Sequence, residues 1–182
     1  MAKKAAVLLT LTLTALLAYA QGQVGGLIEG DTWAYLVSAP EGWVWDGTTL
    51  RVQGIRGLFY KAGQAYSPSK LHIYISPTPK KAGGPVGLAQ FIVADEASFM
   101  RADTGIIVKD LPPYEPGPGY RFELRDFDDR NEDYYQALAY YEGDAAFFIF
   151  VLSCRSVEER EAERASFLAL LDTFTYIKKE GP

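Results

Sequence analysis

The densest group of side chains that could do chemistry is a run of carboxylates between two expected strands. Its members are Asp126, Asp128, Asp129, Glu132 and Asp133. Carboxylates gathered on one turn can coordinate a hard cation such as calcium through several oxygens. The spacing does not match an EF-hand loop, because Arg130 takes the third alternating ligand place and no glycine follows it. Two interpretations stand: a solvated acidic hairpin turn, or a cation site with Asp126, Asp128 and Asp129 as ligands.

Two other reactive side chains occur once each. His72 is the only histidine, which excludes any site that needs two imidazoles, and it alternates with the apolar Leu71 and Ile73 on an expected strand. Cys154 is the only cysteine, so the chain has no internal disulfide. We expect Cys154 to be a small buried residue, the alternative being a reactive thiol. No serine lies in a glycine-flanked nucleophile elbow, and the sequence therefore predicts no catalytic set.

Aromatic residues are frequent in the chain, at 14%. Aromatic side chains with polar tips are favoured where a surface is half apolar and half wet, as at protein interfaces. Alternation along one expected strand places Tyr135 and Tyr141 on one side and Tyr134 and Tyr140 on the other. Trp43, Tyr135 and Tyr141 are therefore candidate binding residues. The alternative is that these tyrosines cover the sheet and that Trp43 packs against the end of a sheet.

The first residues have the pattern of a secretory signal peptide. Lys3 and Lys4 precede an apolar run over residues 5–17, and Ala18-Tyr19-Ala20 comes directly before Gln21. The apolar run is shorter than the roughly 20 residues that a bilayer span needs. We expect cleavage after Ala20 and a protein exported to the periplasm or the extracellular space. Retention of residues 1–20 as an uncleaved anchor is the alternative.

Length and charge limit what the rest of the chain can be. The chain has 182 residues and a formal net charge of −5, which becomes more negative once Lys3 and Lys4 are removed. An acidic protein lacks the basic patch that binding to nucleic acid or anionic lipid requires. We expect a signal peptide at 1–20, a glycine-rich flexible leader at 21–30 and a single domain at 31–182.

Apolar periodicity predicts a chain rich in strands. Strands are expected at 33–38, 55–61, 71–76, 106–109, 120–125, 134–141, 146–153 and 173–177. The segment 147–152 is apolar at every position, which predicts a central strand covered on both faces. The segment 111–119 carries four prolines and two glycines and is expected to be a connection.

Two helices are expected. The first spans 86–100, with Ala89, Val93, Ala97 and Met100 facing inward and with Asp95, Glu96 and Arg101 facing outward. The second begins at Ser156, where Glu159 three residues later completes a capping box. Its inward positions are expected to be Arg164, Phe167, Leu168 and Leu171.

This order of elements resembles that of a known group of proteins. A strand running into Pro40-Glu41-Gly42-Trp43, a helix after the third strand, an antiparallel meander and a charged last helix ending in Leu171-Asp172-Thr173-Phe174 resemble the PsbP-like superfamily, which includes bacterial DcrB-like exported proteins. The resemblance implies an α+β fold, an α/β/α sandwich with a central, mainly antiparallel sheet. Plant members are assembly and stabilising subunits of the oxygen-evolving photosystem, and no catalytic residue carries over from the group.

We therefore expect an exported, non-enzymatic binding or accessory module without a cofactor. Its partner would be an envelope or membrane-associated protein assembly. Two alternatives stay open: a cation-dependent enzyme that uses the acidic turn at 126–133 with calcium, and a small-molecule carrier with an apolar pocket between helix and sheet.

Overall fold

The computed structural model describes residues 25–49, 55–67, 71–102, 105–129, 131 and 134–179. The helices are α2 (Leu88–Ala102) and α3 (Val157–Thr173). The strands are β1 (Gly25–Glu29), β2 (Trp33–Ser38), β3 (Trp43–Asp46), β4 (Gly57–Lys61), β5 (His72–Pro79), β6 (Ile106–Gly117), β7 (Tyr120–Asp129), β8 (Tyr134–Glu142), β9 (Ala146–Cys154) and β10 (Thr175–Lys178). The expected signal peptide at 1–20 lies outside the described residues.

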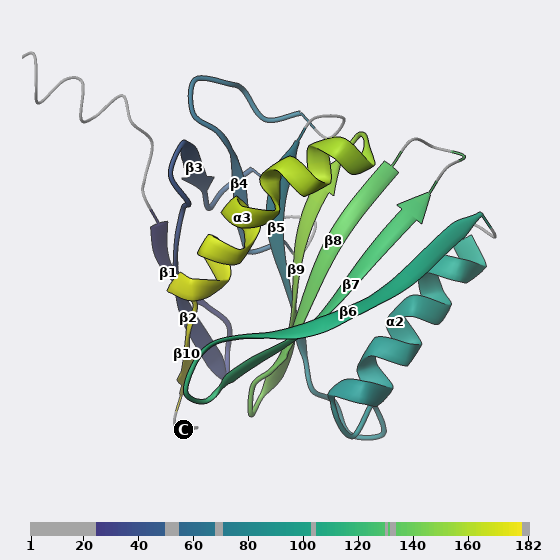
Figure 1. Ribbon diagram of the computed structural model, residues 1–182. Helices are drawn as coiled ribbons and strands as arrows, with labels where there is room; N and C mark the ends of the chain where they lie inside the picture. Colours follow the sequence, from purple (N-terminus) through teal and green to yellow (C-terminus); the bar gives the residue numbers. More distant parts are fainter. Residues whose placement is uncertain are drawn as a thin grey trace, which may run out of the picture.

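The strands form two antiparallel sheets (Figure 1). The larger sheet has seven strands in the order β3-β4-β5-β9-β8-β7-β6, and the smaller sheet has the order β1-β2-β10. Strand β9 pairs with β5 on one side and with β8 on the other. Its central position confirms the prediction made from its unbroken apolar run.

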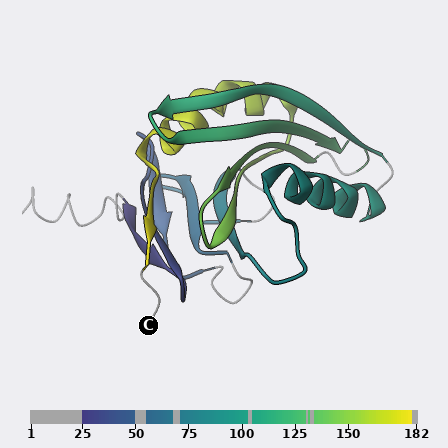
Figure 2. The same cartoon turned by 90° about the horizontal axis from the view of Figure 1, so that it is seen from below.

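The two faces of the large sheet are covered by different elements. Alternation along β9 directs Phe148 and Phe150 to the core beneath α3 and the small sheet, and Phe147 and Val151 to the core beneath α2. Figure 2 shows α2 and α3 on different sides of the curved sheet. A helix thus covers each face, but α3 shares its face with a second sheet that the sequence did not predict.

Strand β1 occupies part of the segment expected to be a flexible leader. It pairs with β2 over its whole length, and the side chain of its Ile28 is buried. Gly26 serves a close approach, because a Cβ atom there would lie 2.5 Å from the ring of Trp45. Glycine in this segment therefore allows strand packing and is no sign of a flexible leader at residues 25–29.

Strand β6 overturns the expected connection at 111–119. It runs from Ile106 to Gly117 as the last strand of the large sheet and pairs with β7. The pairing register shifts between Leu111 and Tyr114 and again between Tyr114 and Gly117. Prolines are tolerated at sheet edges and at bulges, where the missing N–H costs no ladder hydrogen bond. The prediction was wrong because it treated these prolines as strand breakers.

Helix α3 begins where the capping pattern predicts. The Glu159 N–H donates to Ser156 Oγ at 3.1 Å. The Glu159 carboxylate in turn accepts from the Arg155 N–H at 2.9 Å, one residue before the N-cap. The buried residues of the helix are Arg160, Phe167, Leu170 and Leu171. Arg160 was not among the residues predicted to face inward, yet it is the most deeply buried charged residue of α3.

Candidate functional site

The acidic residues of β7 face arginines of α3. Arg164 Nη2 lies 2.8 Å from Asp126 Oδ2, and Arg160 Nη2 lies 3.4 Å from the same oxygen. Arg160 Nη1 also donates to Asp128 Oδ1. Asp126 and Arg160 are almost fully buried, at 2% and 3% exposure. These carboxylates form an ion-pair network that holds α3 on the sheet, so neither the solvated turn nor the cation site describes Asp126 and Asp128.

Asp129 lies apart from this network. Strand alternation sends its side chain to the opposite face from Asp126 and Asp128, and its carboxylate accepts a hydrogen bond from the Asn131 N–H at 3.0 Å. Within the described ranges, no three His, Cys, Asp or Glu side chains gather so that they could hold a metal ion. The structure does not bring the three expected ligands together.

The candidate aromatic residues belong to the core and its margin. Trp43 is 5% exposed, and Lys61 Nζ lies 4.5 Å from the centre of its ring. Tyr135 and Tyr141 share one face of β8, as alternation predicted, and both are partly buried against the core beneath α3. The Tyr141 ring lies 5.2 Å from that of Phe174, and burial raises the pKa of its phenol to about 12. These three side chains pack the fold and offer little free surface.

The single histidine and cysteine are also buried. The His72 ring lies 5.8 Å from that of Tyr74 and 5.4 Å from that of Tyr66. Cys154 is 2% exposed, and burial raises the pKa of its thiol to about 12. Because the thiolate is the reactive form of cysteine, Cys154 has the buried, unreactive character that we expected.

Helix α2 has two apolar faces, and the predicted stripe lies on the exposed one. Phe91 and Ile92 are buried, with the Phe91 ring stacked at 4.4 Å on that of Phe147. Val93 is 65% exposed and Met100 is 46% exposed. The sequence prediction that this second pair faces inward was therefore wrong.

Polar contacts with the sheet set this orientation of α2. The Tyr140 hydroxyl donates to Asp95 Oδ2 at 2.8 Å, and Arg125 Nε donates to Glu96 Oε1 at 3.0 Å. Both acidic residues were expected to face solvent. Their partners lie on β8 and β7, which the sequence of the helix alone cannot reveal.

A groove of about 820 Å³ runs between the first half of α2 and the sheet. We call it the α2 groove. Val86, Leu88, Ile92, Val93 and Glu96 line its helix side, and Asp110, Glu123, Arg125 and Glu142 line its sheet side. Arg125 pairs with Glu96 and with Asp110, at 3.0 and 2.9 Å. The groove thus combines aliphatic side chains with four carboxylates and one guanidinium.

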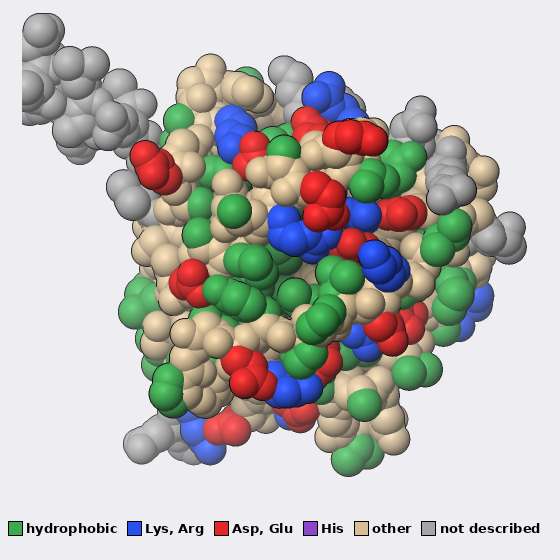
Figure 3. All heavy atoms as spheres, in the orientation of Figure 1, with side chains coloured by type: hydrophobic (Ala, Val, Ile, Leu, Met, Phe, Trp, Pro, Cys, Tyr) green, Lys and Arg blue, Asp and Glu red, His purple; other side chains and the backbone are tan. Residues whose placement is uncertain are grey.

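The exposed stripe borders this groove. We call Ala89, Val93 and Met100 of α2, together with Val86 just before the helix, the α2 stripe. Val86, Ala89 and Val93 also line the groove. Figure 3 shows hydrophobic side chains on the surface over α2, at the right of the view, with acidic and basic side chains among them. Stripe and groove together place exposed apolar side chains next to charged ones.

A second pocket lies on the other side of α2. We call it the Asp95 pocket; it has a volume of about 390 Å³ and lies between α2, the end of β5 and the start of β9. Its apolar walls are Phe91, Ala94, Phe147, Ile149, Pro79 and Pro85, and its polar groups are Asp95, Ser98, Thr78, Lys80 and Lys81. Its place between helix and sheet is that of the apolar pocket in the carrier alternative.

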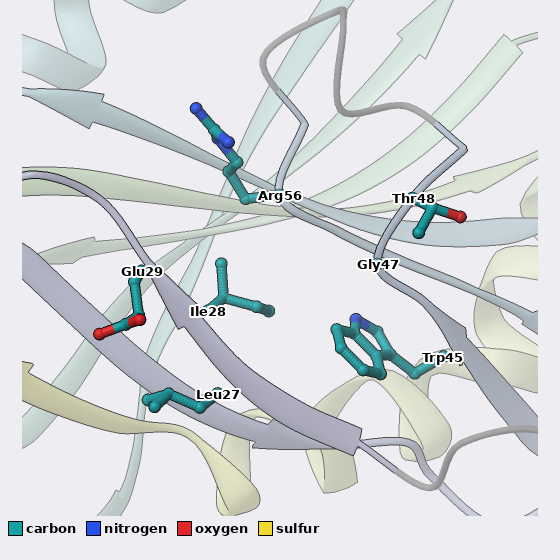
Figure 4. Close-up of a pocket in the computed structure, with 7 residues that line it drawn as sticks. All are labelled: Leu27, Ile28, Glu29, Trp45, Gly47, Thr48 and Arg56. Carbon is teal, nitrogen blue, oxygen red and sulfur yellow. The ribbon is translucent and has the colours of Figure 1, made fainter.

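A third pocket, of about 290 Å³, lies where β1 meets β3 and β4 (Figure 4). The ring of Trp45 is held close to Gly26 and Gly47. Thr48 donates its hydroxyl to Asp46, and Glu29 pairs with Lys179. In Figure 4 the Thr48 hydroxyl and the Glu29 carboxylate point away from Trp45. With these groups turned outward, the pocket is a joint between the two sheets.

Comparison with known proteins bears on the fold. No family model and no curated protein sequence matches the chain. Among solved structures, the solution structure of cyanobacterial PsbP (CyanoP) from Synechocystis sp. PCC 6803 is similar, with a TM-score of 0.52 and 11% sequence identity. The match covers 81% of this chain and 88% of that chain. The fold is PsbP-like. The likeness to DcrB-like proteins stays a prediction.

One feature of this PsbP-like fold that sequence reasoning missed is the exposed apolar face of α2. Ala89, Val93 and Met100 were recognised as apolar but placed on the wrong face, although α2 has more apolar positions than one buried face can take. This excess of apolar positions was the signal from which a second, exposed apolar face could have been predicted. No helix in the described part of the chain is long and apolar enough to cross a membrane.

Proposed function

We propose that the protein is an exported, non-enzymatic accessory module that binds an envelope protein through the α2 stripe and the α2 groove. The observation that carries this proposal is the exposed second apolar face of α2, where Val93 is 65% exposed, next to Val86, which precedes the helix and is 85% exposed. Contiguous exposed apolar surface beside polar groups is typical of interaction sites. Export is supported by the signal-peptide pattern of residues 1–20.

The chemistry of the groove indicates what the partner presents. Its four carboxylates outnumber its single guanidinium, although Glu142 and Glu123 pair with Lys80 and Arg121 outside the groove. Asp110 is 81% exposed at the rim. Val93 and Met100 are seven residues apart on α2 and so lie on one side of the helix. A basic amphipathic helix would bury aliphatic side chains on the stripe and place lysine or arginine beside the carboxylates. We therefore propose a partner segment of this kind.

The cation-dependent enzyme is not part of the proposal. Asp126 and Asp128 are already paired with Arg160 and Arg164, so a cation would have to displace the buried Arg160 and the partly buried Arg164. The carrier alternative concerns the Asp95 pocket and is taken up below.

The test uses an amphipathic Leu–Lys helical peptide as the probe and a Leu–Glu peptide of equal length as its control. We expect the Leu–Lys peptide to bind and the double variant Val93→Ser/Met100→Ser to bind it at least about tenfold more weakly, as expected when interface anchors are lost. The matched control is Leu27→Ser/Leu36→Ser, which changes two exposed residues of the small sheet and should bind normally.

The same variants then serve as baits in an envelope fraction, compared by quantitative mass spectrometry. A protein that is captured by the wild type and by the small-sheet variant, but not by the α2 variant, would support the proposal. Equal binding of the two peptides, equal losses in both variants, or self-association through α2 in place of partner capture would each overturn it.

A further inference from the structure

We propose that the Asp95 pocket binds a small organic cation, an apolar body bearing a protonated amine whose ammonium pairs with the Asp95 carboxylate. This inference goes beyond the accessory function, because the pocket and the α2 groove lie on different sides of α2. The two sites share no lining residue.

The walls of the pocket suit an apolar body. Phe91 and Phe147 stack face to face at 4.4 Å with an angle of 10° between the rings, and Ile149 continues the apolar wall along β9. The volume of about 390 Å³ lies within the range of small-ligand sites, which are mostly apolar with a few polar groups that fix orientation.

Asp95 is the polar group that gives the pocket its negative charge. Its carboxylate accepts a hydrogen bond from the Tyr140 hydroxyl at 2.8 Å, and Tyr140 is fully buried behind it. In the described part of the chain no lysine or arginine forms an ion pair with Asp95. Burial raises the pKa of this carboxyl, and the nearby Glu96 raises it further, while the Tyr140 hydrogen bond lowers it. A ligand cation would supply the charge that the protein does not.

The two lysines of the pocket do not make its charge positive. Lys80 Nζ lies 2.5 Å from Glu142 Oε1, so its charge is already paired. The same atom lies 4.8 Å from the centre of the Phe147 ring. Lys81 is exposed on the loop before α2 and is solvated. An anionic ligand would have to draw Lys80 from Glu142 and would approach Asp95 with the wrong charge.

The experiment compares three probes that share a phenylethyl body by isothermal titration calorimetry with the full chain: 2-phenylethylamine, 2-phenylethanol and 3-phenylpropionate. We expect saturable binding of the amine at neutral pH. Because one charge-assisted hydrogen bond is lost, Asp95→Asn should weaken amine binding by about tenfold or more. Glu96→Gln changes the next acidic residue, which faces Arg125 and the other groove, and should weaken amine binding much less than Asp95→Asn does.

A second pair of variants leaves Asp95 in place. Ala94→Phe enlarges a residue of the pocket wall and should abolish amine binding, whereas Ala89→Phe enlarges an alanine that lines the α2 groove and should not. Tighter binding of 3-phenylpropionate than of the amine would overturn the proposal in favour of the lysines. Absence of saturable amine binding, or an equal loss in Ala94→Phe and Ala89→Phe, would also overturn it. If the Leu–Lys peptide does not bind but the amine does, the proposed accessory function is overturned and the proposal for the Asp95 pocket stands.

Discussion

Arg160 carries its guanidinium into the space between α3 and β7, where two aspartates face it. The sequence shows that Asp126 and Asp128 share a strand face and that Arg160 and Arg164 share a helix face, because strands repeat every two residues and helices every three to four. It does not show that these two faces meet. The pairing depends on where α3 crosses the sheet, and the cluster was therefore assigned to water or to a cation.

We expect Arg160→Met to lower the free energy of unfolding by about 3–5 kcal/mol, because removing the buried guanidinium leaves Asp128 without its partner and Asp126 with Arg164 alone. The control is Arg155→Met. Arg155 pairs with Glu159 but is 66% exposed, and exposed ion pairs contribute little to stability. Urea titration of both variants measures the difference, and similar values for the two would contradict the assignment of the network.

Asp95 should give the stability a definite dependence on pH. Its pKa in the folded protein is raised by burial, so the folded state holds this proton to higher pH than the unfolded chain does. The stabilisation is complete below the ordinary value of 3.8 and is lost as pH rises through the raised value. We expect the free energy of unfolding of the wild type, minus that of Asp95→Asn, to fall between acidic and neutral pH.

Asp46→Asn provides a control of opposite sign. Burial alone would raise the pKa of Asp46, but hydrogen bonds from Thr49 and Thr48 outweigh it and the pKa is lowered. The corresponding difference for Asp46→Asn should therefore rise with pH. Urea titrations across this range measure both slopes. Slopes of the same sign would show that one of the two environments is misassigned.

At the scale of elements, α2 shows the limit of apolar periodicity. The positions of Ala89, Val93 and Met100 fit a helical stripe as well as those of Leu88, Phe91 and Phe99 do. Only the sheet residues opposite the helix decide between the two faces, through Phe147, Tyr140 and Arg125. The existence of the helix could be predicted, but its rotation could not.

The two faces of α2 should respond differently to truncation. Phe91→Ala should cost about 3–5 kcal/mol in the free energy of unfolding, because it removes a buried aromatic ring. Val93→Ser should stay within about 0.5 kcal/mol, as is usual for surface substitutions. Chemical denaturation with circular dichroism measures both. If Val93→Ser costs as much as Phe91→Ala, the exposed assignment of the α2 stripe is wrong.

The contact of β1 with Trp45 can be tested through glycine. A Cβ atom at Gly26 would lie 2.5 Å from the Trp45 ring, which leaves no room for it. We expect Gly26→Ala to destabilise the protein by about 1–3 kcal/mol, the usual cost of overpacking. Gly117→Ala is the control, since nothing lies within 4 Å of its added carbon. Thermal denaturation that ranks the two variants in the reverse order would contradict this packing of β1.

At the scale of the whole molecule, the meander β7-β8-β9 and helix α3 were predictable because their signals are local. Alternation, short turns and a capping serine lie within a few residues of one another. The small sheet was not predictable as a sheet. Strand β2 pairs with β10, and Ala34 lies opposite Ile177 from the far end of the chain. No periodic pattern within either strand reports such a partner.

The position of β2 between β1 and β10 also determines the order in which its two edges are paired during synthesis. The hairpin of β1 and β2 is complete early, but the second edge of β2 stays open until residues 175–178 have left the ribosome. An open strand edge is a template for pairing with another chain. A product that ends before Thr175 would keep that edge permanently, so early termination or C-terminal proteolysis would leave a template for aggregation.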